Sequence, residues 1–257
     1  MPYRARVRTD QIALQLWTVR TLTATDVPGT LRAVAAAGYR AVELAAIGHV
    51  DPVVLRTVLD DNGLSVVASH EPIAGLREDP AAVAARLAVL GCPRVIVPWL
   101  PEEARLTHSD VRRYADDLGR LAGVFADHGL GFGYHNHDFE FAPLDGTTIW
   151  EILLAELPAS VGLELDVYWA ARAGQDPVGL IAAAPDRIRL LHMKDRSSDV
   201  DERDAPAGEG NLDFPAIVET ARAAGVEWYI AEQDEPVSVL DDIASAYRHL
   251  ASLATSS

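Results

Sequence analysis

The chain has 257 residues, of which 49% are hydrophobic and 23% charged, and 38 Asp and Glu against 22 Lys and Arg give a formal net charge of −16. This composition excludes a disordered or fibrous protein, and the charge argues against nucleic acid or an anionic membrane surface as a partner. No apolar run approaches the ~18 to 20 residues that cross a bilayer. Because Cys92 is the single cysteine and the amino-terminal segment shows no apolar leader, we expect a cytoplasmic protein.

Short apolar or β-branched runs alternate with longer, Ala-rich amphipathic segments along the chain. The short runs predict eight strands, at Ile12–Leu16, Ala41–Leu44, Leu64–His70, Arg94–Pro98, Gly131–His137, Val161–Asp166, Arg189–His192 and Trp228–Glu232. The longer segments predict helices at Pro28–Ala37, Pro52–Asn62, Pro80–Leu90, Asp110–His128, Thr148–Leu157, Pro177–Ala184, Pro215–Ala224 and Val239–Leu253.

The ends of these helices carry recognisable start and stop signals. Several begin with Asp followed by Pro, as at Asp51-Pro52, and several end at Gly, as at Gly63 and Gly91. Strands that alternate with helices imply parallel strands, and eight such units close a barrel. We therefore predict one α/β domain over residues 1–257, a single (β/α)8 TIM barrel with parallel strands. The main alternative, a doubly wound open sheet, lacks its Gly-rich phosphate turn after the first strand.

Polar residues are concentrated at the carboxyl ends of the predicted strands, where a barrel of this kind builds its active site. They are Gln15, Glu43, His70, His135, His137, Glu164, Asp166, His192, Lys194 and Glu232. Any one of them is more often a hydrogen-bonded structural group than a ligand. Burying this many ionisable groups at one end without a function would nevertheless be costly, so their concentration indicates a site.

Strand alternation sharpens this prediction. Successive side chains point to opposite faces, so Glu164 and Asp166 share one face of the sixth strand, and His192 and Lys194 share one face of the seventh. Asp166, His192 and Glu232 are then expected to converge, and carboxylates with an imidazole suit a divalent cation. Such a cation would also relieve the mutual repulsion of carboxylates in one cavity.

The first three strands are expected to contribute substrate-binding groups, namely Gln15, Glu43 and His70. Trp17 and Trp169, near strand ends, fit equally well as packing residues and as the apolar wall on which a sugar ring stacks.

Four segments together resemble a sugar phosphate isomerase/epimerase of the xylose-isomerase-like TIM-barrel superfamily. They are Tyr134-His135-Asn136-His137-Asp138-Phe139-Glu140-Phe141, Leu165-Asp166-Val167-Tyr168-Trp169, Leu191-His192-Met193-Lys194-Asp195 and Gly208-Glu209-Gly210-Asn211-Leu212-Asp213-Phe214. The resemblance covers essentially the whole chain. It implies one divalent cation, Mn²⁺ first with Mg²⁺, Co²⁺ and Zn²⁺ as alternatives, held by Glu, Asp, His and Glu from strands five to eight.

Three of those ligand positions match Asp166, His192 and Glu232, whereas the fifth strand departs from the family pattern. Where the epimerases have Glu, this chain has two histidines, so we take Glu140 as the fourth ligand and His135 or His137 as a proton carrier. The alternative is that one of the histidines replaces the carboxylate.

The expected function is a metal-dependent sugar isomerase or epimerase that abstracts a proton next to the carbonyl of a keto sugar or related polyol, through an enediolate. Glu232 is the expected base, and Lys194 a further catalytic group. The alternative is a lyase or dehydratase that acts on a 3-oxo sugar, glycoside or inosose by β-elimination. An endonuclease IV-like repair enzyme, against which the charge argues, and a non-catalytic partner subunit complete the hypotheses. The expected partner is a small carbohydrate, and a homo-oligomer is compatible with the sequence.

Overall fold

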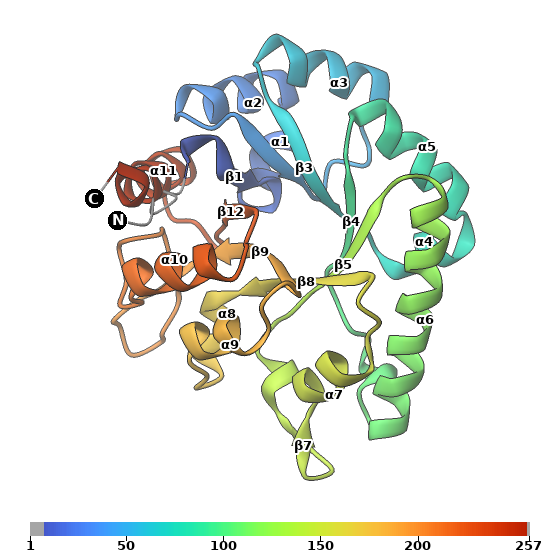
Figure 1. The fold of residues 1–257 in the computed structure, drawn as a ribbon. Helices are drawn as coiled ribbons and strands as arrows, with labels where there is room; N and C mark the ends of the chain where they lie inside the picture. Colours follow the sequence, from blue (N-terminus) through green and yellow to red (C-terminus); the bar gives the residue numbers. More distant parts are fainter. Residues whose placement is uncertain (1–7, 256–257) are drawn as a thin grey trace, which may run out of the picture.

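Eight parallel strands form a closed barrel at the centre of the computed structural model, which describes residues 8–255 (Figure 1). The strands are β1 Ile12–Gln15, β2 Ala41–Leu44, β3 Ser65–His70, β4 Arg94–Val97, β5 Gly131–His135, β8 Val161–Asp166, β9 Ile188–Met193 and β12 Trp228–Ala231. Neighbours in the chain are neighbours in the barrel, and β1 pairs with β12 to close it. The predicted (β/α)8 barrel is confirmed.

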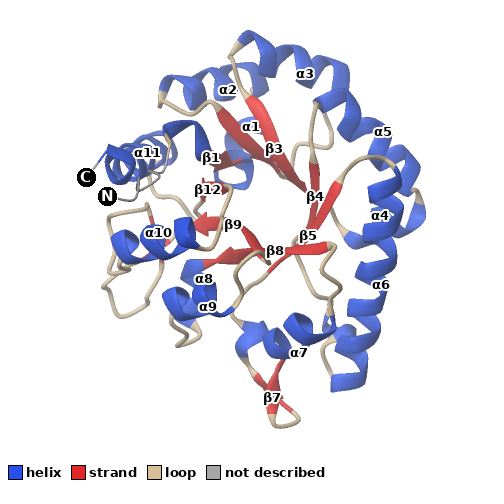
Figure 2. Cartoon of the chain, viewed as in Figure 1, coloured by secondary structure: helices blue, strands red, loops and turns tan. Residues whose placement is uncertain are grey.

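Helices surround the barrel (Figure 2). They are α1 Arg20–Thr23, α2 Val27–Ala36, α3 Pro52–Asp61, α4 Ile73–Glu78, α5 Pro80–Leu90, α6 His108–Asp127, α7 Ile149–Glu156, α8 Val167–Arg172, α9 Pro177–Ala183, α10 Phe214–Ala223 and α11 Val239–Thr255. The periodicity of the sequence does not predict α1, α4 and α8, because helices of four to six residues are too short to show an apolar period.

The connections also contain short 3-10 helices and two small hairpins. The 3-10 helices are η1 Thr9–Gln11, η2 Leu16–Val19, η3 Glu102–Ala104 and η4 Phe139–Phe141. The hairpins pair β6 Pro143–Leu144 with β7 Thr147–Thr148, and β10 Asp195–Arg196 with β11 Asp204–Ala205.

The start and stop signals act as predicted from the sequence. The carboxylate of Asp51 accepts hydrogen bonds from the backbone N–H groups of Val53 and Val54, and so caps α3. At the end of α5, Gly91 adopts φ 66°, a left-handed conformation that is strained for residues with a Cβ. Helix ends therefore follow from local chemistry, which explains why their positions could be predicted from the sequence.

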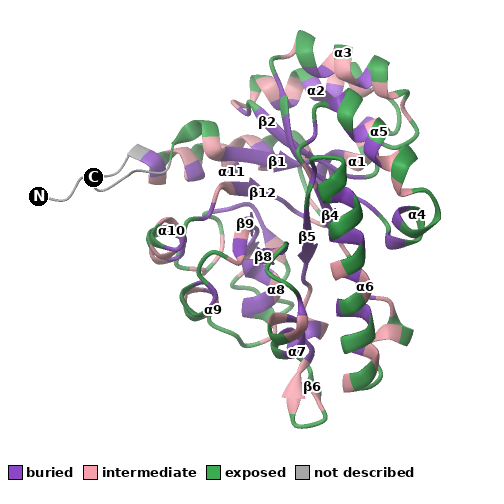
Figure 3. Cartoon of the chain, turned by 45° about the vertical axis from the view of Figure 1, so that its right-hand side comes forward, coloured by how far each residue is buried: buried purple, intermediate pink, exposed green. Residues whose placement is uncertain are grey.

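Two apolar layers hold the strands in place. The larger layer lies between the strands and the helices, whose inward faces are buried (Figure 3). A small layer inside the barrel includes Ala13, Ile96, Leu190 and Ile230. Space inside is tight: a Cβ added at Gly133 would lie 2.7 Å from Cδ1 of Ile96. The barrel interior is thus tightly packed at this inner apolar layer. Polar side chains enter the barrel nearer to the carboxyl ends of the strands.

No helix within residues 8–255 is long and apolar enough to span a membrane. The expectation of a protein without an apolar leader rests partly on residues 1–7, which lie outside the described residues.

Candidate active site

Every strand except β4 turns a polar side chain into the barrel one pleat above the inner apolar layer. These side chains are Gln15, Glu43, His70, His135, Glu164, His192 and Glu232. All are buried except His70, which is half-buried. They occupy alternate positions to apolar or glycine residues of the same strands, as the pleat requires. Seven of the ten predicted strand-end residues thus lie one pleat above the inner apolar layer, and the other three, His137, Asp166 and Lys194, stand two residues further along the chain than His135, Glu164 and His192.

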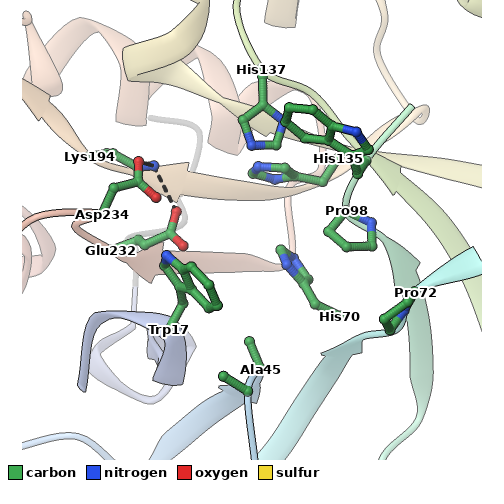
Figure 4. Close-up of a pocket in the computed structure, with 12 residues that line it drawn as sticks. Trp17, Ala45, His70, Pro72, Pro98, His135, His137, Lys194, Glu232 and Asp234 are labelled. Atoms are coloured by element: carbon green, nitrogen blue, oxygen red, sulfur yellow. Dashed lines mark hydrogen bonds and ion pairs between the residues drawn. The ribbon is translucent and has the colours of Figure 1, made fainter. Parts of the chain in front are cut away.

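A cavity of about 450 Å³ is bounded by part of this layer. Figure 4 shows Glu232, Lys194 and Asp234 together on one side of the cavity, with His135 and His137 on another. Apolar residues complete the lining: Trp17, Ala45, Ala46, Pro72, Pro98 and Trp99. The cavity therefore combines ionisable groups with apolar walls, which is the usual composition of a small-molecule site.

The predicted substrate-binding residues lie in three different places. Trp17 and His70 line this cavity. Gln15 and Glu43 are fully buried, and Gln15 Nε2 donates a hydrogen bond of 2.8 Å to Glu43 Oε2. Trp169 lines a neighbouring cavity of about 320 Å³. Direct contact with substrate in the larger cavity is therefore open to Trp17 and His70.

Asp166, His192 and Glu232 converge as strand alternation predicted. One donor atom from each lies within 4.8 Å of the others, and His192 Nδ1 is 2.8 Å from Glu232 Oε2. Asp166 also has a structural task, because its Oδ1 accepts hydrogen bonds from the N–H groups of Tyr168 and Trp169 and caps α8. This capping role could not be predicted, since α8 itself was not.

Lys194 balances the charge of these carboxylates. Its fully buried ammonium lies 3.1 Å from Asp166 Oδ2, 2.9 Å from Glu232 Oε2 and 2.6 Å from Asp234 Oδ2. Burial lowers the pKa of Lys194, but the three carboxylates outweigh burial and hold that pKa well above its usual value. Burial likewise raises the pKa of Glu232, while Lys194 and His192 bring it well below the usual value. The site thus contains a buried ammonium beside an ionised carboxylate.

A second group of converging donors lies on β3, β5, β8 and β9. Oε2 of Glu164 is 2.7 Å from His70 Nε2, 3.1 Å from His135 Nδ1 and 3.2 Å from His192 Nε2. Oε1 of Glu164 is buried and has no hydrogen-bond partner. Strand alternation places Glu164 on the inward face, but we assigned it no ligand role from the sequence. The missed signal was that each of these four donors stands two residues after an inward-facing apolar or glycine residue of its strand.

The two groups differ in how well they fit a divalent cation. Burial, more than any neighbouring charge, lowers the pKa of His135 to about 3, so its imidazole is neutral and keeps a lone pair for a metal. With His70, His192 and Glu164 it makes a donor set that borderline cations accept. Burial lowers the pKa of His70 and of His192, but the neighbouring carboxylates outweigh burial and raise both, so a cation here would have to displace protons from these two imidazoles. In the other group Lys194 already supplies a positive charge beside Asp166 and Glu232.

Glu140 lies apart from both groups. It is fully buried in η4, where Oε1 accepts a hydrogen bond from the Tyr134 hydroxyl and Oε2 accepts one of 2.8 Å from the N–H of His137. Burial raises its pKa to about 7. Its assignment as the fourth ligand stays a prediction. His137 lines the cavity with a buried Nδ1 that has no hydrogen-bond partner.

The fold and the polar strand ends define a class of TIM-barrel protein, and sequence comparison specifies it. The chain belongs to the xylose isomerase-like TIM barrel family, whose sequence pattern matches residues 31–253. An inosose dehydratase of Geobacillus kaustophilus is 30% identical over 211 residues, which cover 68% of this chain and 67% of the relative. The rhizopine catabolism protein MocC of Rhizobium meliloti is 28% identical over 153 residues, or 53% of this chain and 46% of MocC.

Solved structures agree with this assignment. A sugar phosphate isomerase/epimerase from Parabacteroides distasonis superposes with a TM-score of 0.83 at 27% identity, over 93% of this chain and 97% of the other. The IOLI protein, solved with a bound zinc atom, superposes with a TM-score of 0.74 over 95% and 98% of the two chains. Its sequence is only 16% identical, so it shows a common fold.

Proposed function

We propose that the protein is a cation-dependent sugar isomerase or epimerase that removes a proton next to a carbonyl. The observation that carries this proposal is the placement of Glu232 on one side of the cavity and of His135 and His137 on another (Figure 4). A reaction that takes a proton from one face of a carbon and returns one to the other face needs two proton carriers that flank the substrate. The family assignment supports the same chemistry.

The residues of the cavity have distinct tasks in such a reaction. Glu232 is held ionised and accepts the proton. The ammonium of Lys194, 2.9 Å from Glu232, stabilises the negative charge that develops on the substrate oxygen. His135 and His137 carry neutral imidazoles, because burial lowers the pKa of both, and either ring can exchange a proton with the other face of the substrate.

A divalent cation would polarise the substrate carbonyl. His192 is common to both groups of donors that could hold the cation. Mn²⁺ is the first cation to test, with Mg²⁺, Co²⁺ and Zn²⁺ as alternatives. The carbohydrate partner, a homo-oligomer and a cytoplasmic location stay predictions.

A dehydratase or lyase is the second candidate. Its first step is the same proton abstraction, after which Glu232 could return the proton that it accepted to a departing hydroxyl group, while Lys194 keeps its charge beside Glu232. The inosose dehydratase among the relatives favours this candidate. The two reactions differ only after the proton is removed, since an isomerase returns an isomeric sugar and a dehydratase releases water.

Proton exchange in D₂O tests the shared step. The protein is loaded with Mn²⁺ and incubated with a panel of free sugars, 3-oxo sugars and inososes, and we expect deuterium to enter the carbon next to the carbonyl of the substrate. Recovery of a labelled isomer identifies an isomerase or epimerase, and a dehydrated product identifies the lyase. Absence of exchange with every compound and cation would favour a non-catalytic barrel.

Glu232→Gln tests the base. The variant keeps an oxygen that can face Lys194 but removes the proton acceptor, so exchange should fall by about 100-fold or more. Glu78→Gln, an exposed carboxylate on α4, is the matched control and should exchange like the wild type. If Glu232→Gln exchanges at the wild-type rate, the role of base passes to His135 or His137.

A further inference from the structure

We propose that the protein takes a disaccharide, with the reacting sugar in the larger cavity of about 450 Å³ and the second sugar ring in the neighbouring cavity of about 320 Å³. This inference rests on the proposed function and names its substrate class. Residues of α8, of the loop after β9 and of the loop after β12 line the smaller cavity. Its volume by itself lies in the range of ~300 to 1,000 Å³ that is typical of ligand pockets.

The two cavities meet at Asp234 and Trp169. Asp234 lines both of them. Trp169 lines the smaller one, and its ring centroid lies 5.4 Å from the ammonium of Lys194 and 5.5 Å from the ring centroid of His137. Lys194 and His137 both line the larger cavity (Figure 4). A ligand that contacts Glu232 at one end can therefore continue past Asp234 into the smaller cavity.

Hydrogen bonds hold the walls of the smaller cavity in place. The Tyr168 hydroxyl donates a hydrogen bond of 3.1 Å to the backbone oxygen of Glu202 and accepts one of 3.1 Å from Arg172 Nη1. Oδ2 of Asp204 accepts a hydrogen bond from the backbone N–H of Asp234. These bonds join all three segments that build the cavity. Walls that are fixed in advance lower the cost of ordering on binding, which favours a ligand site over a loose gap between loops.

The lining of the smaller cavity suits a neutral, hydroxylated ring. Four carboxylates stand there against two guanidinium groups, so the excess of negative charge disfavours a phosphate or a carboxylate. Carboxylates accept hydrogen bonds from hydroxyl groups and guanidinium groups donate to hydroxyl oxygens, so both kinds of residue bind a sugar. Tyr168 and Trp169, with ring centroids 4.9 Å apart, add apolar surface for the C–H groups of the ring. Arg172 lies 5.7 Å from the Trp169 centroid, so the sugar meets that ring beside the guanidinium.

The chemistry of the larger cavity decides which of the two sugars reacts. Proton abstraction needs a carbonyl, and a sugar whose anomeric carbon is joined to another ring is a closed acetal without one. The reacting sugar is therefore the reducing end, whose open-chain form supplies the carbonyl beside Glu232, and the non-reducing ring occupies the smaller cavity. An isomerase or epimerase reaction moves protons within the reducing sugar only. The glycosidic bond stays intact, and no oxidant or co-reactant is needed.

Reduced disaccharides test the second cavity without turnover, because they lack the carbonyl. Maltitol, cellobiitol, lactitol, isomaltitol and melibiitol each join a second ring to sorbitol, so sorbitol is the matched control for the reacting half. Calorimetric titration of the Mn²⁺-loaded protein should show at least one of them binding about tenfold more tightly than sorbitol, through ring contacts and hydrogen bonds in the smaller cavity. Sorbitol 6-phosphate should bind more weakly than that disaccharide alditol. No preference for any of the disaccharide alditols over sorbitol, or tighter binding of the phosphate, overturns the proposal.

A double variant then locates the second ring. Arg203 and Glu235 line the smaller cavity and not the larger one, and both are exposed, so their replacement leaves the interior intact. Arg203→Ala/Glu235→Ala should lower the affinity for the preferred disaccharide alditol by about fivefold or more, while the affinity for sorbitol changes by less than about twofold. Arg113→Ala/Glu78→Ala, an exposed pair of positions on α6 and α4, is the matched control and should bind like the wild type. A wild-type preference in Arg203→Ala/Glu235→Ala overturns the proposal.

Proton exchange in D₂O separates this proposal from the proposed function. Deuterium should enter the reducing sugar of the disaccharide whose alditol binds most tightly. Tight binding of the alditol without exchange in any sugar leaves the second-ring site standing and overturns the proposed reaction. Exchange with monosaccharides, together with no preference for the disaccharide alditols, overturns the second-ring site and leaves the proposed reaction standing.

Discussion

Lys194 determines the charge balance of the candidate active site. A lysine is rarely fully buried, and here its ammonium is held by three carboxylates, Asp166, Glu232 and Asp234. Such a cluster is stable only as a unit, because removal of one member leaves buried charge without a partner. The ammonium is thus the positive charge that balances these carboxylates in this structure.

We therefore expect an unusual effect of Lys194→Met. The variant should lose about 3 to 5 kcal/mol of unfolding free energy without metal, since the carboxylates then repel one another in the interior. It should also gain a cation site, so Mn²⁺ should raise its melting temperature more than that of the wild type. Thermal unfolding with and without Mn²⁺, compared between Lys194→Met and the wild type, measures both effects.

An equal shift of the melting temperature by Mn²⁺ in Lys194→Met and in the wild type would contradict this prediction. It would mean that removal of the ammonium does not create a cation site. Lys194→Arg serves as the control that keeps the positive charge, and it should not acquire the additional response to Mn²⁺. If Lys194→Met folds only in Mn²⁺, that dependence is the predicted effect in its strongest form.

At the scale of the elements, the strands were predictable because their signals are local. The alternation in Val161–Asp166 places Leu163 and Leu165 on one face and Glu164 and Asp166 on the other, and the structure confirms this division. The same parity brought Asp166, His192 and Glu232 together correctly. Parity also placed Lys194 on the same face as His192, but it did not reveal the pair of Lys194 with Asp234, because Asp234 lies in the loop that follows β12.

The hydrogen bonds that organise the loop after β9 could not be predicted from the sequence. Asp195 is fully buried, and its two carboxylate oxygens accept hydrogen bonds from the backbone N–H groups of Arg196, Gly208, Gly210 and Leu212. One side chain thus holds both ends of the segment 196–212. In the sequence, Asp195 simply begins a polar stretch, and nothing local marks it as a residue that organises a loop.

Asp195→Asn should therefore loosen this loop. The amide keeps one acceptor oxygen but directs an NH₂ group at two backbone donors, which costs about 1 to 3 kcal/mol of local stability. Hydrogen exchange at the amides of Gly208 and Gly210 should become about tenfold faster or more. Asp199→Asn, an exposed position in the same loop, is the control. Unchanged exchange in Asp195→Asn would show that other contacts hold the loop.

At the scale of the whole molecule, the two ends of the barrel differ in how their charged residues are arranged. The carboxyl ends of the strands concentrate ionisable groups around a cavity, whereas at the opposite end Glu227 forms ion pairs with arginines on two strands. Its carboxylate contacts Arg94 of β4 at 2.7 Å and hydrogen-bonds with Arg189 of β9, just before β12 begins. Because β9 is the neighbour of β12 whereas β4 lies far from both in the barrel order, Glu227 connects opposite sides of the barrel and so stabilises it.

Glu227 should therefore make the stability of the barrel depend on pH. Burial alone would raise its pKa, but the hydrogen bonds from Arg94 and Arg189 outweigh burial and lower it. A carboxylate whose pKa is lower in the folded state stabilises that state above the unfolded pKa of about 4.3, and the contribution disappears as pH falls through the folded value. Because the side chain is 33% exposed, solvent screening limits the effect to about 1 to 2 kcal/mol.

Urea unfolding of the wild type and Glu227→Gln measures this contribution. The wild type should be more stable at pH 7, and the difference should shrink as pH falls below about 4, since the wild-type carboxylate then becomes neutral like the amide. Glu102→Gln disrupts an exposed pair with Arg105, so its unfolding free energy should match the wild type throughout. A difference for Glu227→Gln that widens toward acid pH would mean that the arginines do not stabilise the carboxylate, and closure of the barrel would then rest on its apolar layers alone.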